Sequence, residues 1–376
     1  MTTDLDRSLA WARRHMPVTQ AELELLPALP GVHLACSIHL TYTALPALET
    51  LLARGAALFV TTCNPATVQD DCVQRLLAAG AAGHAWLNMT AADQADAIER
   101  ALAWQPTHLF EMGADLSAAV VTRGRPAGVR AGLEVTGSGI TRLQRLAGGG
   151  QALSFPVFNC DDVPIKEGLH NRYLVGLMTW HTFTARTRLS LHGKRVLVIG
   201  YGLVGEGVAN AARAWGGAVT VAGRDPSRAL MARFAGYETG PLEALLPAAD
   251  VVVTATGAAH VLNARHFPLL KTGSFLLNVG HTSDEIEVGT LGPRQGVLPF
   301  VEEVALDGRS VYLFAGGSMA NLTAGQGDSL NSFDLTLGTM VAGLRYIFTA
   351  AAAQQAPGIH PLPREAWEGV AATAVE

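Results

Sequence analysis

A glycine-rich stretch between two apolar runs constrains the fold of this chain more than any other feature. The β-branched run at 195–199 leads into Gly200-Tyr201-Gly202-Leu203-Val204-Gly205, and an alanine-rich segment follows. This order predicts a strand, a tight turn and a helix. Glycines at the first, third and sixth positions let the backbone turn sharply, let amide groups approach a pyrophosphate, and let the helix pack on the strand. We therefore predict dinucleotide contacts at Gly200, Gly202, Leu203, Val204 and Gly205.

The surrounding residues favour a nucleotide-binding domain over glycines that only shape a turn. A second β-branched run at 218–222 follows the alanine-rich segment, and later apolar runs supply strands for a doubly wound sheet. After the second strand such folds place an acid that binds the ribose diol of NAD, but this chain has Gly223 and Arg224 there. An arginine at that position accommodates a 2'-phosphate, so the local residues leave NADP open.

Composition narrows the class of protein. With 376 residues, 49% of them hydrophobic and 16% charged, the chain is typical of a soluble α/β enzyme with two domains. A net charge of -5 without a long basic run gives no electrostatic footprint for nucleic acid. The four cysteines form no set with zinc spacing, so we expect no metal site.

Two stretches bear on cellular location. The first residues carry Asp4 and Asp6 where a signal peptide needs basic residues. The one long apolar stretch, 335–353, contains Arg345, which is costly at a bilayer centre. We therefore expect a cytoplasmic protein that is not embedded in a membrane.

In the first half of the chain, polar residues follow the ends of apolar runs. His39 and Thr41 follow the first run, Asn64 follows the second, and Glu111 follows the third. In open α/β sheets that edge binds ligands. The first half is therefore itself a plausible ligand-binding domain.

These patterns predict an α/β protein of two domains. We expect a Rossmann-type doubly wound cofactor domain over 181–327, inserted into an α/β substrate-binding domain over 1–180. A largely helical stretch over 166–190 leads into the glycine loop, and a C-terminal helix within 328–376 returns to the substrate domain.

Several stretches, taken together, resemble the S-adenosyl-L-homocysteine hydrolase family. Residues 200–207 are similar to the family's GYGxVGxG loop, and Ile38-His39-Leu40-Thr41 is similar to its LHMT segment. The similarity continues in order through Cys63-Asn64, Gln69-Asp70, Gly113-Ala114-Asp115-Leu116, Thr254-Ala255-Thr256-Gly257, Arg265-His266-Phe267, Asn278-Val279-Gly280-His281 and Asn321-Leu322. An ordered set along nearly the whole chain is far more specific than any single motif.

The resemblance implies an elimination that is masked by a redox cycle. In that family NAD oxidises a ribose 3'-hydroxyl to a ketone, which acidifies the C4' proton. A base removes this proton, the 5' substituent leaves, water adds, and the ketone is reduced again. The resemblance thus implies tightly bound NAD that is regenerated in each cycle. It also implies an adenine nucleoside as substrate and a homodimer or homotetramer.

The resemblance also assigns roles to individual residues. Lys166 lies where the family has its catalytic lysine, and His39 and His281 correspond to active-site histidines. A lysine freed of its proton by burial can remove a hydroxyl or C4' proton, and a histidine exchanges protons near pH 7. The alternatives are a snorkelling surface lysine and hydrogen-bonded core histidines. The other substrate positions are Thr41, Thr43, Asn64, Gln69, Glu134, Asn171 and Asp328. The other cofactor positions are Thr136, Gly137, Ser138, Asn171, Arg224, Thr256, Gly257, Asn278, Gly280, His281 and Asn321.

The sequence departs from the family where the chemistry is most demanding. Met112 occupies the place of a catalytic aspartate, although Glu111 is its neighbour. Val135 replaces a substrate-binding glutamate, although Glu134 is its neighbour. A thioether neither gives nor takes a proton, so activating a water or a leaving group needs another residue.

Two further departures from the family lie at the positions that partner the catalytic lysine and that adjoin the adenine ring. His170 stands where an aspartate partners the lysine, and Asp328 replaces a histidine beside the adenine. We therefore hypothesise a nucleoside 5'-dehydratase, similar to enzymes that convert a psicofuranine-like nucleoside into a 4',5'-unsaturated product of the angustmycin type in antibiotic biosynthesis. His39, together with Glu111, then acts as the acid on the leaving hydroxyl. The alternatives are S-adenosyl-L-homocysteine hydrolysis and a catalytically weak NAD-binding regulatory protein.

Overall fold

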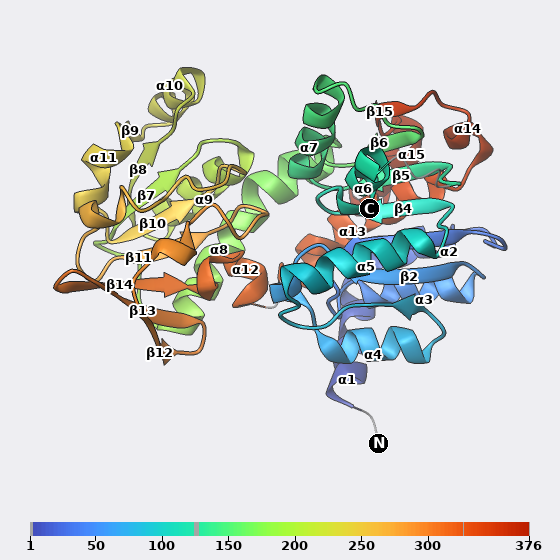
Figure 1. Ribbon diagram of the computed structural model, residues 1–376, viewed down its shortest axis with the longest axis horizontal. Coiled ribbons are helices and arrows are strands. Elements are labelled where there is room, and N and C mark those ends of the chain that lie inside the picture. Colours follow the sequence, from blue (N-terminus) through green and yellow to red (C-terminus); the bar gives the residue numbers. More distant parts are fainter. Residues whose placement is uncertain (1–2, 124–127, 326, 376) are drawn as a thin grey trace. The chain divides into compact units, whose positions relative to one another are not determined.

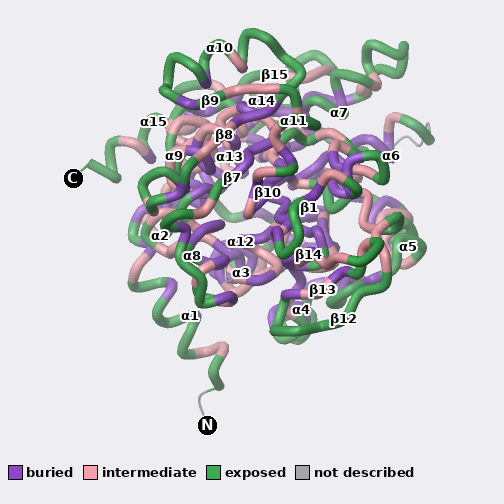
Figure 2. Tube along the Cα trace, turned by 90° about the vertical axis from the view of Figure 1, so that its left-hand side faces the viewer, coloured by how far each residue is buried: buried purple, intermediate pink, exposed green. Residues whose placement is uncertain are grey.

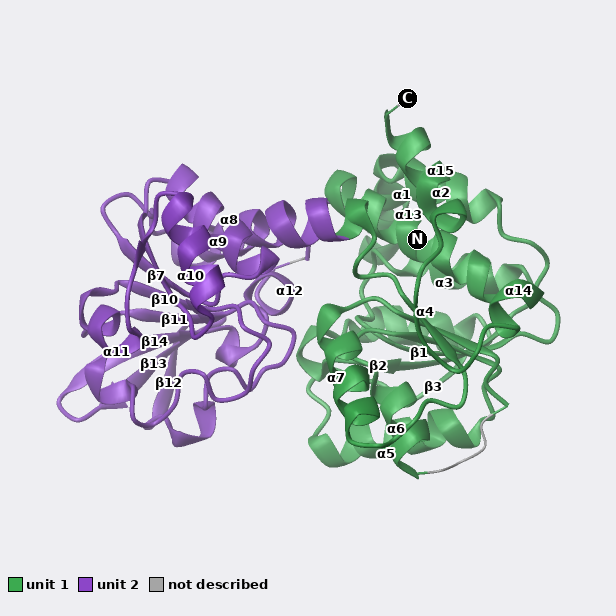
Figure 3. Cartoon of the chain, turned by 90° about the horizontal axis from the view of Figure 1, so that it is seen from above, with its two compact units in different colours: residues 1–166, 330–376 green, residues 167–329 purple. Residues whose placement is uncertain are grey.

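The computed structural model describes residues 3–123, 128–325 and 327–375, and the chain divides into two compact units. Unit 1 comprises Met1–Lys166 and Leu330–Glu376, and unit 2 comprises Glu167–Ser329 (Figure 3). Each unit is built on its own sheet with helices around it. The predicted two-domain α/β class with a Rossmann-type cofactor domain is confirmed.

Unit 1 contains a seven-stranded parallel sheet in the order β15-β6-β5-β4-β1-β2-β3 (Figure 1). The direction of strand succession reverses between β1 and β4, and ligands bind at such a switch point, beyond the carboxyl ends of the strands. The strands are β1 (His33–Ile38), β2 (Ala57–Thr62), β3 (Ala82–Gly83), β4 (His108–Glu111), β5 (Ala131–Glu134), β6 (Pro156–Asn159) and β15 (Gly358–Pro361).

Helices cover both faces of the unit 1 sheet because alternate strand residues point to opposite faces. Phe110, Leu133 and Phe158 belong to one apolar core, together with residues of α1, α3, α4 and α13. Leu109 and Val157 belong to the other, together with residues of α5, α6 and α7. The inner strands β4 and β5 are fully buried, whereas the edge strand β15 is only partly buried (Figure 2). The helices of unit 1 are α1 (Asp4–His15), α2 (Pro17–Glu24), α3 (Leu45–Ala53), α4 (Asp70–Ala78), α5 (Ala91–Ala103), α6 (Asp115–Arg123), α7 (Gly137–Gly148), α13 (Leu330–Ile347), α14 (Ala350–Ala353) and α15 (Arg364–Val375).

Unit 2 contains an eight-stranded sheet in the order β12-β13-β14-β11-β10-β7-β8-β9 (Figure 1). The strands from β14 to β9 are parallel, whereas β12 and β13 form an antiparallel edge. Here the switch point lies between β7 and β10. The strands are β7 (Arg195–Ile199), β8 (Ala218–Ala222), β9 (Glu238–Thr239), β10 (Val251–Thr254), β11 (Phe275–Asn278), β12 (Arg294–Leu298), β13 (Val301–Leu306) and β14 (Arg309–Phe314).

A π-helical segment, η2 (Lys166–Leu174), begins at the last residue of the first part of unit 1 and leads directly into α8 (Val175–Thr187) of unit 2. The stretch predicted as largely helical is therefore helical from residue 166, but its first turns are π-helical, a conformation frequent at functional sites. It ends at Thr187 because Arg188 adopts a left-handed conformation with φ 58°. The remaining α-helices of unit 2 are α9 (Leu203–Ala214), α10 (Pro226–Phe234), α11 (Leu242–Leu245) and α12 (Ala320–Thr323).

Two glycines bring the π-helical segment and α8 close to α9. A Cβ on Gly207 would lie 2.0 Å from the carbonyl oxygen of Arg172, and a Cβ on Gly176 would lie 2.4 Å from the carbonyl group of Gly207. Only glycine permits this backbone contact. It fixes the backbone around Asn171 against the helix that follows the glycine loop.

Candidate active site

The glycine loop has the geometry that a pyrophosphate requires. Gly200 has φ 99°, and a Cβ there would lie 2.6 Å from the carbonyl oxygen of Ala255. A Cβ on Gly205 would lie 2.1 Å from the carbonyl oxygen of Gly200, whereas Gly202 has nothing within 4 Å. The first and third glycines are therefore needed for the turn and for packing, and the second faces open space. Leu203 and Val204 begin α9 at this point, so the loop fits a dinucleotide.

Glu285 joins the two loops that follow β10 and β11. Its buried carboxylate accepts hydrogen bonds from the Gly257 amide at 2.6 Å, the Thr256 amide at 3.0 Å and the Thr256 hydroxyl at 2.8 Å. A Cβ on Gly280 would lie 1.7 Å from Glu285 Oε1, so only glycine fits there. Burial raises the pKa of Glu285, while the donors from residues 256 and 257 oppose that rise.

Asn278 orders the second of these loops from within. Its Oδ1 accepts from the Gly280 amide at 2.8 Å and from the Thr254 hydroxyl at 3.1 Å. Its Nδ2 donates to the Thr282 carbonyl at 2.8 Å. His281 is half-buried in this loop, and Asn321 is buried in α12. The structure thus places Thr256, Gly257, Asn278, Gly280 and His281 on two loops held together by side chains.

His170 and Asp328, predicted separately, form a pair within unit 2. His170 Nε2 lies 2.6 Å from Asp328 Oδ2, although the residues are 158 positions apart in the sequence. Both side chains are largely buried. Asn171, the next residue, is half-buried.

Lys166 is buried in unit 1 and forms an ion pair with Asp161. The sequence did not single out Asp161, although it lies only five residues before the lysine. A Cβ on Gly137 would lie 2.7 Å from Asp161 Oδ2. The start of α7, where Thr136 is the N-cap and Gly137 and Ser138 are the first helical residues, therefore lies against the carboxylate that holds Lys166.

His39 lies just beyond the carboxyl end of β1, and its Nδ1 is 2.8 Å from the Thr67 hydroxyl. That hydroxyl donates its own hydrogen to the Asn64 carbonyl at 2.8 Å. Thr67 therefore accepts from His39, which places a hydrogen of the imidazole on Nδ1.

The other predicted substrate residues of this region are engaged in local contacts. The hydroxyls of Thr41 and Thr43 lie 2.9 Å apart. Asn64 Oδ1 accepts from the Ala66 amide at 3.1 Å, and Gln69 Oε1 accepts from the Tyr42 amide at 2.8 Å. These bonds fix the loops that follow β1 and β2.

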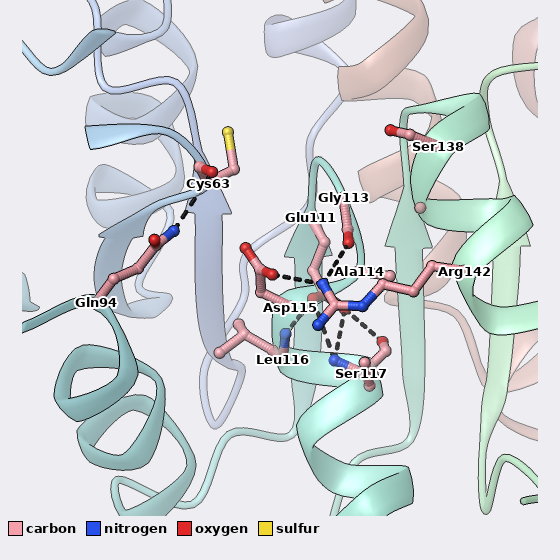
Figure 4. A network of polar contacts seen from close by, with 12 residues as sticks. Cys63, Gln94, Glu111, Gly113, Ala114, Asp115, Leu116, Ser117, Ser138 and Arg142 are labelled. Carbon is pink, nitrogen blue, oxygen red and sulfur yellow. Dashed lines mark hydrogen bonds and ion pairs between the residues drawn. The ribbon is translucent and has the colours of Figure 1, made fainter. Parts of the chain in front are cut away.

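Glu111 ends β4 and points to the start of α6 (Figure 4). Its buried carboxylate accepts from the Leu116 amide at 2.6 Å, from the Ser117 amide at 3.1 Å, and from the Ser117 hydroxyl. Negative charge at a helix N-terminus is stabilised by the unpaired amides. All of these contacts hold the turn between β4 and α6.

Glu134, at the end of β5, holds the same turn from the neighbouring strand. It is paired with Glu111 in the register of the sheet. Its carboxylate accepts from the amides of Gly113 and Ala114 at 2.9 and 2.8 Å, and from the Thr136 amide and hydroxyl at 2.8 and 2.6 Å. Gly113 and Ala114 both have positive φ, so the carboxylate stabilises a strained turn.

Burial raises the pKa of both glutamates. The pKa of Glu111 rises to about 7, and that of Glu134 rises to about 8 because the nearby Glu111 charge adds to the effect of burial. Asp115, which begins α6, accepts from Arg142 at 2.6 Å, and burial raises its pKa too (Figure 4). The sequence did not predict the Asp115 and Arg142 pair, because the two residues lie on different helices.

Met112 and Val135 take the two positions where the resemblance indicates lost acids. Both are buried and belong to the same apolar core as Phe110 and Leu133. Within residues 3–123, 128–325 and 327–375, no cluster of three or more histidine, cysteine or acidic residues could hold a metal ion. In the same part of the chain, no helix is both long enough and apolar enough to cross a membrane.

Unit 2 is a dinucleotide-binding domain of the Rossmann type, and unit 1 presents a buried lysine and a hydrogen-bonded histidine near the ends of its strands. Comparison with known proteins identifies the family. Residues 8–127 match S-adenosyl-L-homocysteine hydrolase, and residues 180–327 match the NAD binding domain of S-adenosyl-L-homocysteine hydrolase.

Similar proteins extend this match along the chain. S-inosyl-L-homocysteine hydrolase of Methanopyrus kandleri is 32% identical over 381 residues, covering 98% of this chain and 89% of that protein. Adenosylhomocysteinase of Aeropyrum pernix is 33% identical over 338 residues, covering 87% of this chain and 81% of that protein. The chain therefore belongs to the S-adenosyl-L-homocysteine hydrolase family, and NAD is its cofactor.

Proposed function

We propose that this enzyme is a nucleoside 5'-dehydratase, which removes water from an adenine nucleoside of the psicofuranine type and leaves a 4',5'-unsaturated sugar. Psicofuranine carries an extra hydroxymethyl group at the anomeric carbon, so the reacting carbons are numbered one higher in that nucleoside. The observation that carries the proposal is the state of the four residues at the ends of β4 and β5. Met112 and Val135 carry no acid, and the carboxylates of Glu111 and Glu134 are occupied by the amides of the turn. The residues for proton abstraction are retained, while the acids for adding water to the product are missing.

NAD supplies the reversible oxidation of a sugar hydroxyl to a ketone, which acidifies the neighbouring C–H bond. We assign removal of that proton to Lys166 in its amine form. The resulting ammonium is stabilised by Asp161, its ion-pair partner. The electron pair of the broken C–H bond forms the C4'–C5' double bond, and the C5'–O bond breaks.

His39 is assigned as the acid that protonates the leaving hydroxyl, so that water departs. Thr67 holds Nδ1 and leaves this task to Nε2. Solvent then carries a proton from Lys166 back to His39. We assign exchange of the sugar hydroxyl proton to His281, and we propose that His170, Asn171 and Asp328 have substrate roles, as the family resemblance implies.

The test offers the purified protein psicofuranine and S-adenosylhomocysteine in separate reactions. Mass spectrometry follows loss of one water from psicofuranine, and a thiol reagent follows release of homocysteine. A third reaction in deuterium oxide follows deuterium entering the sugar, which reports proton abstraction alone. We expect loss of water from psicofuranine and no thiol release at an enzymatic rate.

Variants identify which residues act. Lys166→Met removes the base, so deuterium entry and water loss both stop. Lys271→Met is the matched control, because Lys271 also forms an ion pair, with Asp250, but is exposed and lies in unit 2 just before the start of β11. Equal losses in the two variants would remove Lys166 from the mechanism. Rapid thiol release by the unaltered protein would reject the dehydratase, and inertness towards both substrates would favour a regulatory protein.

A second candidate is hydrolysis of a nucleosyl homocysteine. The similarity to proteins named adenosylhomocysteinase and S-inosyl-L-homocysteine hydrolase favours it. Addition of water to the unsaturated sugar distinguishes the hydrolase from the dehydratase, and it is measured in the unaltered protein and in the double variant Met112→Asp and Val135→Glu. If the protein is a dehydratase, restoring the two acids increases addition of water to the unsaturated sugar. If it is already a hydrolase, the unaltered protein performs that addition.

We also propose that the chain assembles as a homodimer or homotetramer, as the family resemblance implies. Light scattering after size-exclusion chromatography measures the mass directly. A mass of 39.5 kDa, that of one chain, would reject this proposal.

A further inference from the structure

We propose that the cofactor site of unit 2 takes NADP as well as NAD, with Arg224 binding the 2'-phosphate. The juxtaposition that carries this inference is between the glycine loop and the residues that follow β8. β7 and β8 are parallel neighbours in which Ile199 is paired with Ala222, and the Gly200 amide donates to the Ala222 carbonyl at 2.8 Å. Gly223 and Arg224 therefore lie directly beside the loop that receives the pyrophosphate.

The residue beside the adenosine ribose normally decides between the two cofactors. The carboxylate of an acid there accepts hydrogen bonds from both hydroxyls of the NAD ribose and repels a 2'-phosphate, whereas an arginine there forms an ion pair with the phosphate. Gly223 carries no side chain, and nothing lies within 4 Å of the position where its Cβ would stand. The space that an acid would fill is therefore open.

The acid that follows in the sequence is already engaged. Asp225 is the N-cap of α10, and its Oδ1 accepts from the Ser227 amide at 2.8 Å and from the Ser227 hydroxyl at 2.7 Å. These hydrogen bonds lower the pKa of Asp225 and hold its carboxylate at the helix. Asp225 therefore acts as the N-cap of α10, and its carboxylate is held there by the Ser227 donors.

The cations at this edge outnumber that single acid. Arg224 is exposed, and Arg228 is exposed one turn into α10. In the described part of the chain, no carboxylate lies within 4.0 Å of the Arg224 guanidinium to form an ion pair. A guanidinium that forms no ion pair with any described carboxylate, beside the ribose position of a dinucleotide domain, presents planar donors that match a phosphate.

An exchange experiment on the full-length holoprotein tests the inference. The protein is incubated with an equimolar excess of NAD and NADP, free nucleotide is removed, and the protein is denatured. Liquid chromatography with mass spectrometry then measures the ratio of bound NADP to bound NAD. We expect a ratio above about 0.1 for the unaltered chain, because one arginine–phosphate pair offsets a preference of roughly tenfold. The readout is occupancy and not turnover, so it stands whether or not the protein is a dehydratase.

Three variants assign the effect to the residue. Arg224→Ala is expected to lower the ratio at least about tenfold, and Gly223→Glu, which restores an acid in open space, is expected to do the same. Arg195→Ala is the control, because it removes an exposed arginine from the amino end of β7. A ratio below about 0.1 in the unaltered chain overturns the inference, as does a drop in Arg195→Ala equal to that in Arg224→Ala.

Discussion

Substitutions of two glycines in the glycine loop distinguish an effect on NAD affinity from an effect on folding stability. Gly202→Ala adds a methyl group where no atom lies within 4 Å, and the φ of -78° is one that alanine adopts readily. Residue 202 is the N-cap of α9, where alanine is less favourable than glycine, so the variant loses no more than about 1 kcal/mol of folding free energy. The methyl group nevertheless occupies the side of the loop that must admit the pyrophosphate.

Gly205→Ala meets the backbone instead. The new Cβ would lie 2.1 Å from the carbonyl oxygen of Gly200, whereas ordinary contacts begin at 3.4 Å, so 3.4 minus 2.1 leaves 1.3 Å to be made up. Neither atom belongs to a flexible side chain, and α9 must therefore shift away from β7. Such overpacking costs about 1–3 kcal/mol.

Thermal unfolding of the nucleotide-free proteins and titration with NAD distinguish the two effects. We expect Gly202→Ala to unfold within about 4 °C of the parent and Gly205→Ala to unfold up to roughly 10 °C lower. We also expect the Kd for NAD to rise at least about tenfold in Gly202→Ala, a loss of about 1.4 kcal/mol. Unchanged NAD affinity in Gly202→Ala, or greater destabilisation by Gly202→Ala than by Gly205→Ala, would refute this reasoning.

Three buried carboxylates give further predictions. In Gly139→Ala the new Cβ would lie 2.3 Å from Glu134 Cδ, so the glutamate must leave its hydrogen-bond donors. Urea denaturation should then show that the free energy of unfolding falls by roughly 3 kcal/mol. Gly148→Ala is the control, because it lies in the same helix and a Cβ there would meet nothing within 4 Å; equal losses of unfolding free energy in the two variants would contradict the contact. The pKa values of Glu111 and Glu134, about 7 and about 8 against 4.5, mean that the folded state binds protons more tightly than the unfolded state. Unfolding free energy should therefore fall by on the order of 3 kcal/mol per carboxylate as pH rises from about 5 to 8, and stability that rises over this window would contradict the assignment. Glu285→Gln turns an amide NH2 towards the donors of residues 256 and 257, so NAD should dissociate about tenfold faster; release at the parental rate would show that the carboxylate does not order these loops.

The parallel cores could be predicted from the sequence because their strands are buried on both faces. Runs such as those of β7, β10 and β11 are almost continuously apolar, which is typical of parallel strands between two helical layers. The antiparallel edge could not be predicted in full, because β12 is exposed along its whole length and lacks such a run. The short β5, Ala131–Glu134, contains one large apolar residue and becomes a strand through its neighbours β4 and β6.

The glycine loop was the most predictable part of the site, because its function depends on backbone conformation and each glycine has a local steric reason. Contacts across long sequence separations were less accessible. The pair of His170 and Asp328 joins residues that the sequence singled out individually, and nothing in their spacing indicates that they meet. Glu285 was missed because its role is to bind the amides of another loop.

The alternation of a strand explains why an acid one position away does not replace a missing one. Successive side chains point to opposite faces, so Glu111 faces α6 while Phe110 and Met112 belong to the other core. The same holds for Glu134, which lies between Leu133 and Val135 of that core. To act as acids on the substrate, both glutamates would have to release the amides of the Gly113 turn and cross the sheet plane. Under the proposed function, the proton needed at this edge must therefore come from a residue beyond another strand, and the proposal assigns it to His39, which follows the adjacent β1.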